Sequence, residues 1–463
     1  MEEIPTPTRS LISHKVPFKQ KALLGVTNAG ANFVNGMLYG ALLKYYTDYV
    51  LMEPALFGIV YIFFGIWNAI DDPLFGYYSD RKPPVPGVGK RLPWMRRAIP
   101  FMVLGYMMIW YPAPDWGQAL ISIYLLAALF CFDTGFAIFM LNQCALATGF
   151  TDDPDERAST SMVNSYINMI PGAIYSFIPP FILTSSFSRD LVVIIFTIVG
   201  IGGAVMMIIS AWKIKEPSHL FDEKEALSLK KALVETFKSR SFVFFVLYSF
   251  AMSGVALAFN QMVPFIMEDM YGARGFAAIL PGIAGGVFLL ALFPVIRIVN
   301  RKIGVRQTLM IFAVITLAGF LGLTLVENYW IMFIFYTCVM LGSNAHWMLA
   351  NTIVGDIADE DQLKTGHRRE GMFFGINALI STPASSVIIF IFSQILSIFG
   401  YNGEADHQTV QAVFGIRLGV GFVPFCFIVL AIAMLYFYPL HGERYLALKR
   451  DIATLFSKKA ANS

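Results

Sequence analysis

The chain alternates long apolar runs with short polar segments. A membrane-spanning helix needs roughly 20 consecutive, mostly apolar residues, and twelve runs in this chain reach that length. They cover residues 22–49, 54–79, 95–113, 117–147, 160–184, 190–212, 241–270, 273–298, 305–326, 329–358, 369–399 and 409–438. The pattern predicts an all-α membrane protein with twelve transmembrane helices.

The basic residues predict how these helices cross the membrane. Thirty of the 34 Lys and Arg residues fall in the N-terminal segment, in every second loop or in the C-terminal tail. The four exceptions are Lys44, Arg189, Arg274 and Arg417. Loops rich in Lys and Arg stay on the cytoplasmic side. We therefore expect a multi-pass protein of the cell membrane with both termini in the cytoplasm.

A polar segment divides the twelve runs into two sets of six. Residues 213–240 would form a cytoplasmic loop between an N-terminal bundle (1–212) and a C-terminal bundle with its tail (241–463). The Leu and Ala spacing in this loop predicts a short amphipathic helix on the membrane surface. Two similar bundles around a site at mid-membrane are a common transporter plan.

The composition excludes other classes of protein. Hydrophobic residues make up 57% of the chain and charged residues 14%, with a mean hydropathy of +0.63. Soluble domains are about half apolar and a quarter charged. All four cysteines lie in apolar runs without metal-ligand spacing, and we find no nucleophile triad or phosphate loop. We expect no enzyme activity, no metal, no cofactor and no nucleic acid partner.

Two adjacent acids interrupt the second apolar run. Asp71 and Asp72 lie in the stretch Trp67–Lys82, at or below mid-membrane. A carboxylate at such a depth costs roughly 2.5–3.5 kcal/mol on insertion scales. Such an acid is tolerated when it faces a water-filled cavity lined by protein. This arrangement is typical of a secondary transporter.

The first helix carries a polar stripe. Asn28, Asn32 and Asn35 share one face of an otherwise apolar helix, and further amides such as Asn142 and Asn377 recur across the bundle. Amides both donate and accept hydrogen bonds, which suits a hydroxyl-rich neutral ligand. Hydrogen bonding between helices is the other interpretation of these residues.

Three segments together resemble one family. They are Tyr45–Asp48, the stretch around Asp72-Pro73 with Gly76, and Asp356–Asp359 running on to Lys364–Gly371. In this order they resemble the melibiose permease-like glycoside–pentoside–hexuronide:cation symporters of the major facilitator superfamily. Vertebrate lysolipid symporters share the fold and several of these motifs, which leaves the substrate class open.

The resemblance implies where a coupling cation would bind. The family's two helix 2 aspartates correspond to Asn68 and Asp72, and a further acid on helix 4 corresponds to Met140. One family acid is thus in place, and Asp71 or Asp133 would be its relocated partner. A lone buried carboxylate favours binding of a proton, whereas a relocated second acid would still make a sodium site. H⁺ and Na⁺ therefore both remain candidate coupling ions.

The resemblance also implies a substrate site. Asn32 corresponds to a substrate-binding aspartate and Trp347 to a tryptophan beside the sugar. Thr382 stands in place of a helix 11 lysine, and Ser165 in place of a helix 5 arginine. We assign Asn28, Asn142 and Asn377 to the same cavity from their amide chemistry.

The charged loop residues of the predicted cytoplasmic side would form a gate. Their ion pairs would hold the two bundles together there and break when the cavity opens inward. The residues are Asp80, Arg81, Arg157, Asp356, Asp359, Arg368, Arg369 and Glu370. At the other membrane face we expect Lys44 to form a local ion pair with Asp48 and to extend toward water.

We therefore expect a monomeric, cation-coupled symporter that moves a sugar or glycoside by alternating access. A lysophospholipid or other amphiphile is the alternative solute. A non-transporting membrane receptor on the same fold is a third hypothesis.

Overall fold

The computed structural model describes residues 16–113, 115–151, 154–216, 236–365 and 370–461. Within these ranges, each of the twelve predicted runs contains a helix. The helices of the first half are α1 (Phe18–Asp48), α2 (Pro54–Arg81), α3 (Leu92–Trp110), α4 (Gln118–Gly149), α5 (Pro154–Leu183) and α6 (Arg189–Lys213). Those of the second half are α8 (Arg240–Phe265), α9 (Phe276–Ile303), α10 (Val305–Leu325), α11 (Tyr329–Thr365), α12 (Glu370–Ser381), α13 (Ala384–Ile398) and α14 (Val410–Phe437).

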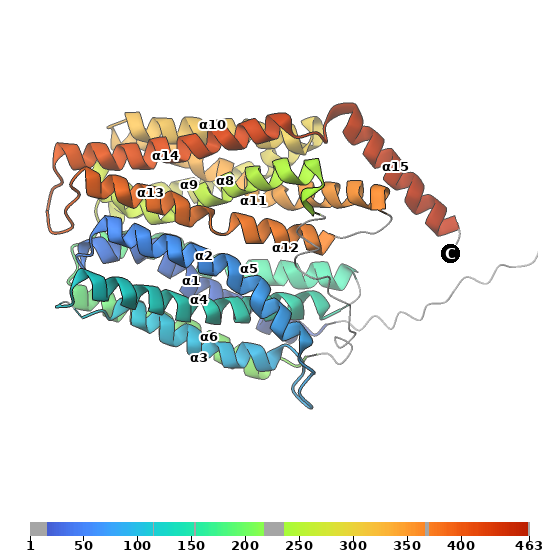
Figure 1. The fold of residues 1–463 in the computed structure, drawn as a ribbon, viewed down its shortest axis with the longest axis horizontal. Helices are drawn as coiled ribbons and strands as arrows, with labels where there is room; N and C mark the ends of the chain where they lie inside the picture. The colour runs from blue at the N-terminus through green and yellow to red at the C-terminus, as the bar shows by residue number, and fades with distance from the viewer. Residues whose placement is uncertain (1–15, 114, 152–153, 217–235, 366–369, 462–463) are drawn as a thin grey trace, which may run out of the picture.

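The helices pack into two bundles that lie side by side (Figure 1). In the first, α1 packs against α5 and α6, while α3 packs against α4 and α6. In the second, α14 packs against α8 and α10, while α10 also packs against α11. The bundles meet along α2 and α13, α1 and α8, and α5 and α9. Most of the predicted loop 213–240, with its amphipathic helix, lies outside the described residues.

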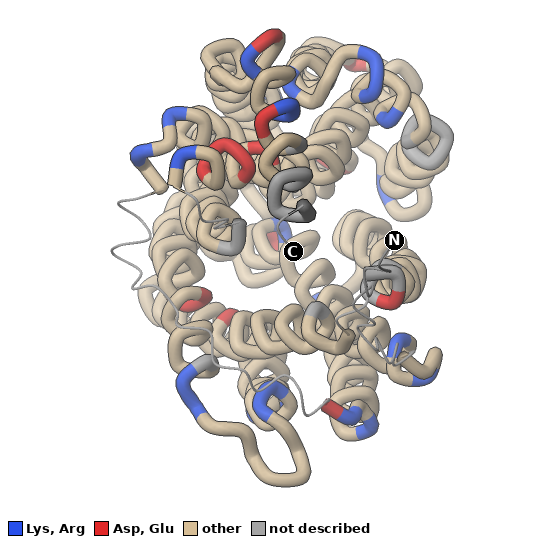
Figure 2. The backbone as a smooth tube through the Cα atoms, turned by 90° about the vertical axis from the view of Figure 1, so that its right-hand side faces the viewer, with Lys and Arg blue, Asp and Glu red and all other residues tan. Residues whose placement is uncertain are grey.

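Both ends of the described chain lie at the same end of the bundles (Figure 1). We call this the inner end, because the distribution of Lys and Arg predicts that it faces the cytoplasm, and the opposite end the outer end. Basic residues lie around the inner end on both bundles (Figure 2).

Local sequence explains several helix boundaries. Ser188, Ser239 and Thr409 cap α6, α8 and α14, each accepting a hydrogen bond from a backbone N–H of the first turn. Pro54 begins α2, where a proline costs no hydrogen bond. These caps begin the helices at residues that follow short polar turns.

The structure differs from the predicted pattern in three places. The run 369–399 is divided into α12 and α13 because Pro383 offers no backbone N–H. The run 241–270 ends in a short π-helix, η2 (Ile266–Met270). The tail, for which no helix was expected, forms α15 (Gly442–Ala461).

Nine helices of the described chain are long and apolar enough to cross a membrane by length and composition alone. α1 and α3 fall outside this set because each mixes polar or charged residues into its span, including the asparagine stripe of α1 and Arg96–Arg97 of α3. Of α9, the residues Phe276–Phe288 count only as a shorter apolar helix.

Candidate functional site

Two adjoining cavities lie between the bundles, near the middle of the helices. The larger has a volume of about 280 Å³ and the smaller about 170 Å³. Both are lined by Asn35 and Tyr39 of α1 and by Leu257 and Asn260 of α8. One helix from each bundle therefore forms the wall that the cavities share.

Two of the predicted acids line the larger cavity. Asp72 of α2 and Asp133 of α4 both contribute to its wall, together with Asn68. The Asn68 side-chain amide donates to both carboxylate oxygens of Asp133, at 2.8 Å each. Because Asn68 and Asp72 lie four residues apart on α2, one helix face presents both to the cavity. The structure thus brings Asn68, Asp72 and Asp133 together.

Asp71 lies behind this wall and is buried, with 1% of its surface exposed. Neither of its carboxylate oxygens accepts a hydrogen bond from the described residues. The charges of Asp133 and Asp72 lie close enough to act on it. Among the described ion pairs, none joins a Lys or Arg to any of the three acids. Such a cluster carries excess negative charge in a poorly solvated place, which favours binding of a cation.

Two amide oxygens of the cavities have no hydrogen-bond partner among the described residues. They are Oδ1 of Asn35, which borders both cavities, and Oε1 of Gln261, which borders the larger one. Gln261 uses its amino group to donate to the hydroxyl of Tyr61 across the bundle interface, at 2.7 Å. A buried acceptor without a donor costs free energy. A bound hydroxyl group would satisfy either oxygen.

The asparagine stripe of α1 serves both of the roles considered for it. Asn28 donates to Asn164 of α5, and Asn32 donates to Asn28 and to Asn168 of α5, all at 3.2 Å. Asn32 also lines the smaller cavity. The stripe therefore joins α1 to α5 through the amides of Asn28 and Asn32, and it presents Asn32 and Asn35 to the smaller cavity.

The other residues assigned to the substrate site are spread more widely. Thr382 lines the larger cavity and donates to the carbonyl of Ala378. Asn377 has an unpartnered Oδ1 among the described residues but lines neither cavity. Asn142 donates to the carbonyl of Ile138 and accepts from Arg91. Trp347 is 52% exposed and lies outside both linings.

A buried lysine joins the two bundles at the outer end. The ammonium nitrogen of Lys44 lies 2.9 Å from Asp48 on its own helix, as the sequence predicted. It also lies 2.6 Å from Asp269 and 3.2 Å from Glu268, both of η2, and 3.0 Å from the hydroxyl of Tyr401. Only 1% of Lys44 is exposed. The expectation that it extends toward water is wrong, because acids of the opposite bundle surround it.

Other contacts close the same end. Gln394 of α13 donates to the carbonyl of Ala55 at 2.9 Å, and Tyr401 donates to Asp48 at 2.8 Å. The backbone N–H of Gly275 donates to Thr184 at 3.0 Å. The hydrogen bonds and ion pairs between described residues of the two bundles thus lie in the outer half. They separate the cavities from the outer side.

The predicted inner gate is described only in part. Asp356 and Asp359 of α11 lie 2.6 and 3.1 Å from Lys449 of α15. Partial burial lowers the pKa of Lys449, but the hydrogen bonds and charges of these acids outweigh it and raise the pKa above its usual value. Arg81 lies over the ring of Tyr77, 4.0 Å from its centroid. Outside the described parts lie Arg368 and Arg369 and the side chains of Asp80, Arg157 and Glu370.

Nearly the whole sequence, covering both bundles, matches one known family. Residues 23–442 match the family described as MFS/sugar transport protein. This chain belongs to that family.

Individual members of the family are similar over nearly their whole length. The glucuronide carrier protein homolog of Escherichia coli (strain K12) is 22% identical, over 89% of this chain and 90% of the relative. The isoprimeverose transporter of Lactiplantibacillus pentosus is also 22% identical, over 94% and 92%. The sodium-dependent lysophosphatidylcholine symporter 1 of Xenopus tropicalis is 20% identical, over 95% and 90%.

A solved structure supports the architecture. The crystal structure of a D-xylose-proton symporter superimposes with a TM-score of 0.65 at 15% identity, covering 90% of this chain and 97% of the other. The fold is therefore the twelve-helix major facilitator fold in two pseudo-symmetric bundles. As a member of the MFS/sugar transport protein family, the chain is a multi-pass membrane symporter and not an enzyme. It carries a small-molecule solute together with a coupling cation.

Sequence reasoning missed two features of this symporter's site. One is the outer closure around Lys44, for which the acids at Glu268-Asp269 were the available signal. The other is Gln261, which was one of several intramembrane amides and had nothing in the sequence to single it out.

Proposed function

We propose that this symporter carries an uncharged, hydroxyl-rich solute of the sugar or glycoside class and is driven by a proton gradient. The observation that carries the proposal is the pair of unpartnered amide oxygens, Asn35 from one bundle and Gln261 from the other. Sugar hydroxyls are the donors that such oxygens accept. A solute held between them would contact both bundles, which is what alternating access requires.

The lining of the cavities favours an uncharged solute. None of the residues that line either one is Lys or Arg. A uronate or a phosphate group would therefore meet the carboxylates of Asp72 and Asp133 without a cation to pair with. Tyr39 and Tyr175 supply flat faces suited to the apolar side of a sugar ring.

The dimensions also favour a sugar over the lysolipid alternative. Pockets for drug-sized ligands measure roughly 300–1,000 Å³, and the larger cavity, at about 280 Å³, falls just below this range. One or two sugar rings fit such a volume, whereas a headgroup with a long acyl chain exceeds it.

The arrangement around Asp133 favours a proton over sodium. Sodium is a hard cation and needs several oxygen ligands. Asn68 offers its N–H groups to Asp133, so it occupies both carboxylate oxygens and supplies no oxygen of its own on that side. The charges of Asp71, Asp72 and Asp133 act on one another, and no described ion pair joins any of them to a basic residue. A cluster of buried carboxylates that includes Asp72 is stabilised when it takes up a proton.

The proton site at the acid cluster and the solute site in the cavity would then be coupled through α1 and α2. Protonation would reduce the negative charge of the acid cluster, and the solute would bind beside it in the same cavity. With the outer end closed around Lys44, the described state would release its solute to the inner side. The charged residues at the inner end, including Asp356 and Arg369, would close that side in the opposite state.

A binding experiment tests the solute class. The purified protein would be heated with neutral sugars and glycosides, with uronates and with lysophospholipids, because a specific ligand raises the unfolding temperature by mass action. We expect stabilisation by a neutral sugar or glycoside. Stabilisation by a lysophospholipid or a uronate alone would contradict the proposal.

Matched variants test the site itself. Asn35→Ala and Gln261→Ala should each weaken sugar binding by about 2- to 13-fold, which corresponds to one net hydrogen bond of about 0.5–1.5 kcal/mol. Asn344→Ala is the control, because Asn344 donates to Met340 within its own helix and lines neither cavity. Equal losses in all three variants would remove Asn35 and Gln261 from the site.

A further inference from the structure

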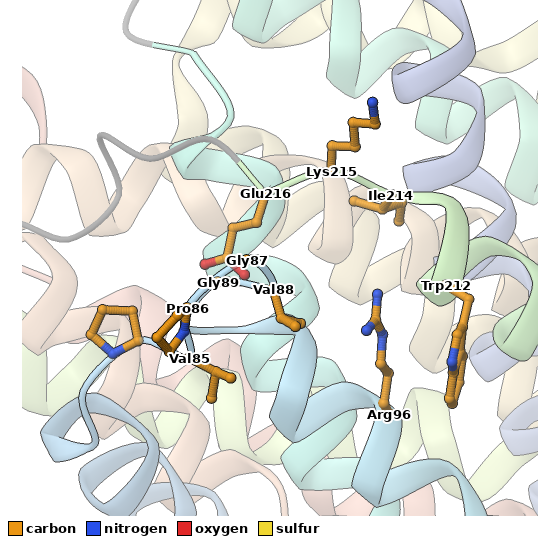
Figure 3. A pocket seen from close by; sticks show the side chains of 11 residues that line it. Val85, Pro86, Gly87, Val88, Gly89, Arg96, Trp212, Ile214, Lys215 and Glu216 are labelled. Carbon is orange, nitrogen blue, oxygen red and sulfur yellow. The ribbon is translucent and has the colours of Figure 1, made fainter.

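A separate pocket lies at the inner end of the first bundle, away from the transport cavities. It has a volume of about 600 Å³ and lies between the α2–α3 turn, the first part of α3 and the end of α6. Figure 3 shows Arg96 beside Trp212 on one side of this pocket, with Glu216 against the turn on the other. None of its lining residues takes part in the solute or cation site proposed above.

A fixed loop forms one wall of the pocket. The Glu216 carboxylate accepts hydrogen bonds from the backbone N–H groups of Lys90, Arg91 and Leu92, at 2.9–3.1 Å. These amides begin α3, so the negative charge of Glu216 is compensated by a helix N-terminus. Gly89 allows this approach, because a Cβ there would lie 2.3 Å from Glu216 Oε2. The pocket therefore has a preformed wall whose acid is already engaged.

The opposite wall presents positive charge. Arg96 donates from Nε to the carbonyl of Ala211 at 3.2 Å, and its guanidinium carbon lies 5.2 Å from the ring centroid of Trp212. This hydrogen bond fixes the guanidinium, and its terminal NH₂ groups have no hydrogen-bond partner among the described residues. The Lys215 side chain is exposed at the rim and likewise lacks an acidic partner among them. Two cations, Arg96 and Lys215, thus border the pocket. The one acid among its lining residues, Glu216, already accepts hydrogen bonds from the backbone at the start of α3.

An apolar face leads along the helices to this pocket. On α6, the residues Ile194, Ile198, Ile201, Val205, Ile208 and Ile209 are 43–64% exposed. On α3, which packs against α6, Phe101 and Leu104 are 58% and 55% exposed. Trp212 follows this face and is 52% exposed, as expected for an indole at the membrane–water boundary. A ligand that fits both features has an anionic head and apolar chains.

We propose that this pocket binds the headgroup of an anionic phospholipid. The phosphate would lie between Arg96 and Lys215, and the acyl chains would follow the exposed face of α3 and α6. Guanidinium groups bind phosphate oxygens in a bidentate manner, and basic pockets beside membrane helices at this depth bind anionic headgroups. The bound lipid would hold the α2–α3 turn, α3 and α6 together.

Native mass spectrometry of the purified full-length protein tests the site. The protein would be equilibrated with phosphatidylglycerol or with phosphatidylcholine, and the retained lipids counted. We expect one more retained phosphatidylglycerol in the wild type than in the double variant Arg96→Gln/Lys215→Gln. The affinity of that variant for this lipid should be about 30-fold lower, and that of Lys215→Gln alone about 5-fold lower.

The control variant removes one Arg and one Lys that lie next to the pocket but do not line it. Arg97 and Lys213 are exposed neighbours that do not line it, and Arg97→Gln/Lys213→Gln should retain lipid as the wild type does. Equal loss in both double variants, or equal retention of phosphatidylcholine, would overturn the proposal. So would displacement of the lipid by millimolar inorganic phosphate, which would show a site for free phosphate. The Lys215→Gln variant keeps the test valid if Arg96→Gln fails to fold, because Lys215 is an exposed residue at the rim of the pocket.

Discussion

Lys44 offers the sharpest test of how the outer end is closed. It is buried, and acids of both bundles surround its ammonium group, with Asp48 on one side and Glu268 and Asp269 on the other. Breaking a buried ion pair by removing one partner costs about 3–5 kcal/mol. The contacts with Glu268 and Asp269 of η2 join the two bundles, so opening of the outer end would break them. Lys44→Met should therefore lower the ratio of closed to open molecules by roughly 100-fold or more.

Cysteine labelling measures this shift. Asn260 borders both cavities, so a single cysteine there, in a background without the four native cysteines, reports access to the cavity. We expect Lys44→Met to increase its labelling by an impermeant maleimide added from outside. Solute should protect the cysteine in both proteins.

A second buried lysine on the same helix is the matched control. Lys21 lies 2.7 Å from Glu156 and donates to Ser159 at 2.8 Å, but all three belong to one bundle. Lys21→Met should lower stability without changing labelling from outside. If Lys21→Met and Lys44→Met increase labelling equally, or neither does, the reasoning about an outer closure is refuted.

Three further predictions concern topology, the inner gate and the substrate site. A single cysteine at Ser457 should react with impermeant reagents only from the cytoplasm and one at Asn402 only from outside; the reverse labelling would contradict the assigned orientation. If these residues close the inner side, Arg369→Ala or Asp80→Ala should slow turnover more than it weakens solute binding, because contacts of a gate would differ between the two states without touching the solute; equal losses would indicate a role in binding or folding. Because Trp347 lines neither cavity, Trp347→Ala should leave sugar binding close to that of the wild type; a strong loss of affinity with normal expression would place this indole beside the solute, as the family resemblance implies.

The helices could be predicted from the sequence because each requires only a local apolar run. The broken helix at Pro383 and the additional helix α15 were harder. A proline within an apolar run is compatible with either a kink or a break. The helix α15 packs against α11 and pairs Lys449 with Asp356, and these contacts form only in the folded protein.

The candidate site was predictable to the extent that family positions are retained. Asn68 and Asp72 were identified from the family resemblance, with Asp71 or Asp133 as the relocated partner; the structure brings Asn68, Asp72 and Asp133 to one cavity and places Asp71 behind its wall. The partners of Lys44 could not be predicted, because Asp269 lies 225 residues away in sequence. Long-range contacts of this kind depend on how the two bundles meet, which no local pattern specifies.

Solute accumulation in proteoliposomes tests the central claim most directly. Vesicles containing wild type or Asp72→Asn would receive a proton gradient, a sodium gradient or neither, with Asp190→Asn, a substitution at the exposed start of α6, as the control. We predict that wild type and Asp190→Asn concentrate a neutral sugar or glycoside under the proton gradient at least as well as under sodium. Asp72→Asn should exchange solute without concentrating it. Strict dependence on sodium with no response to pH, or full accumulation by Asp72→Asn, would contradict the account.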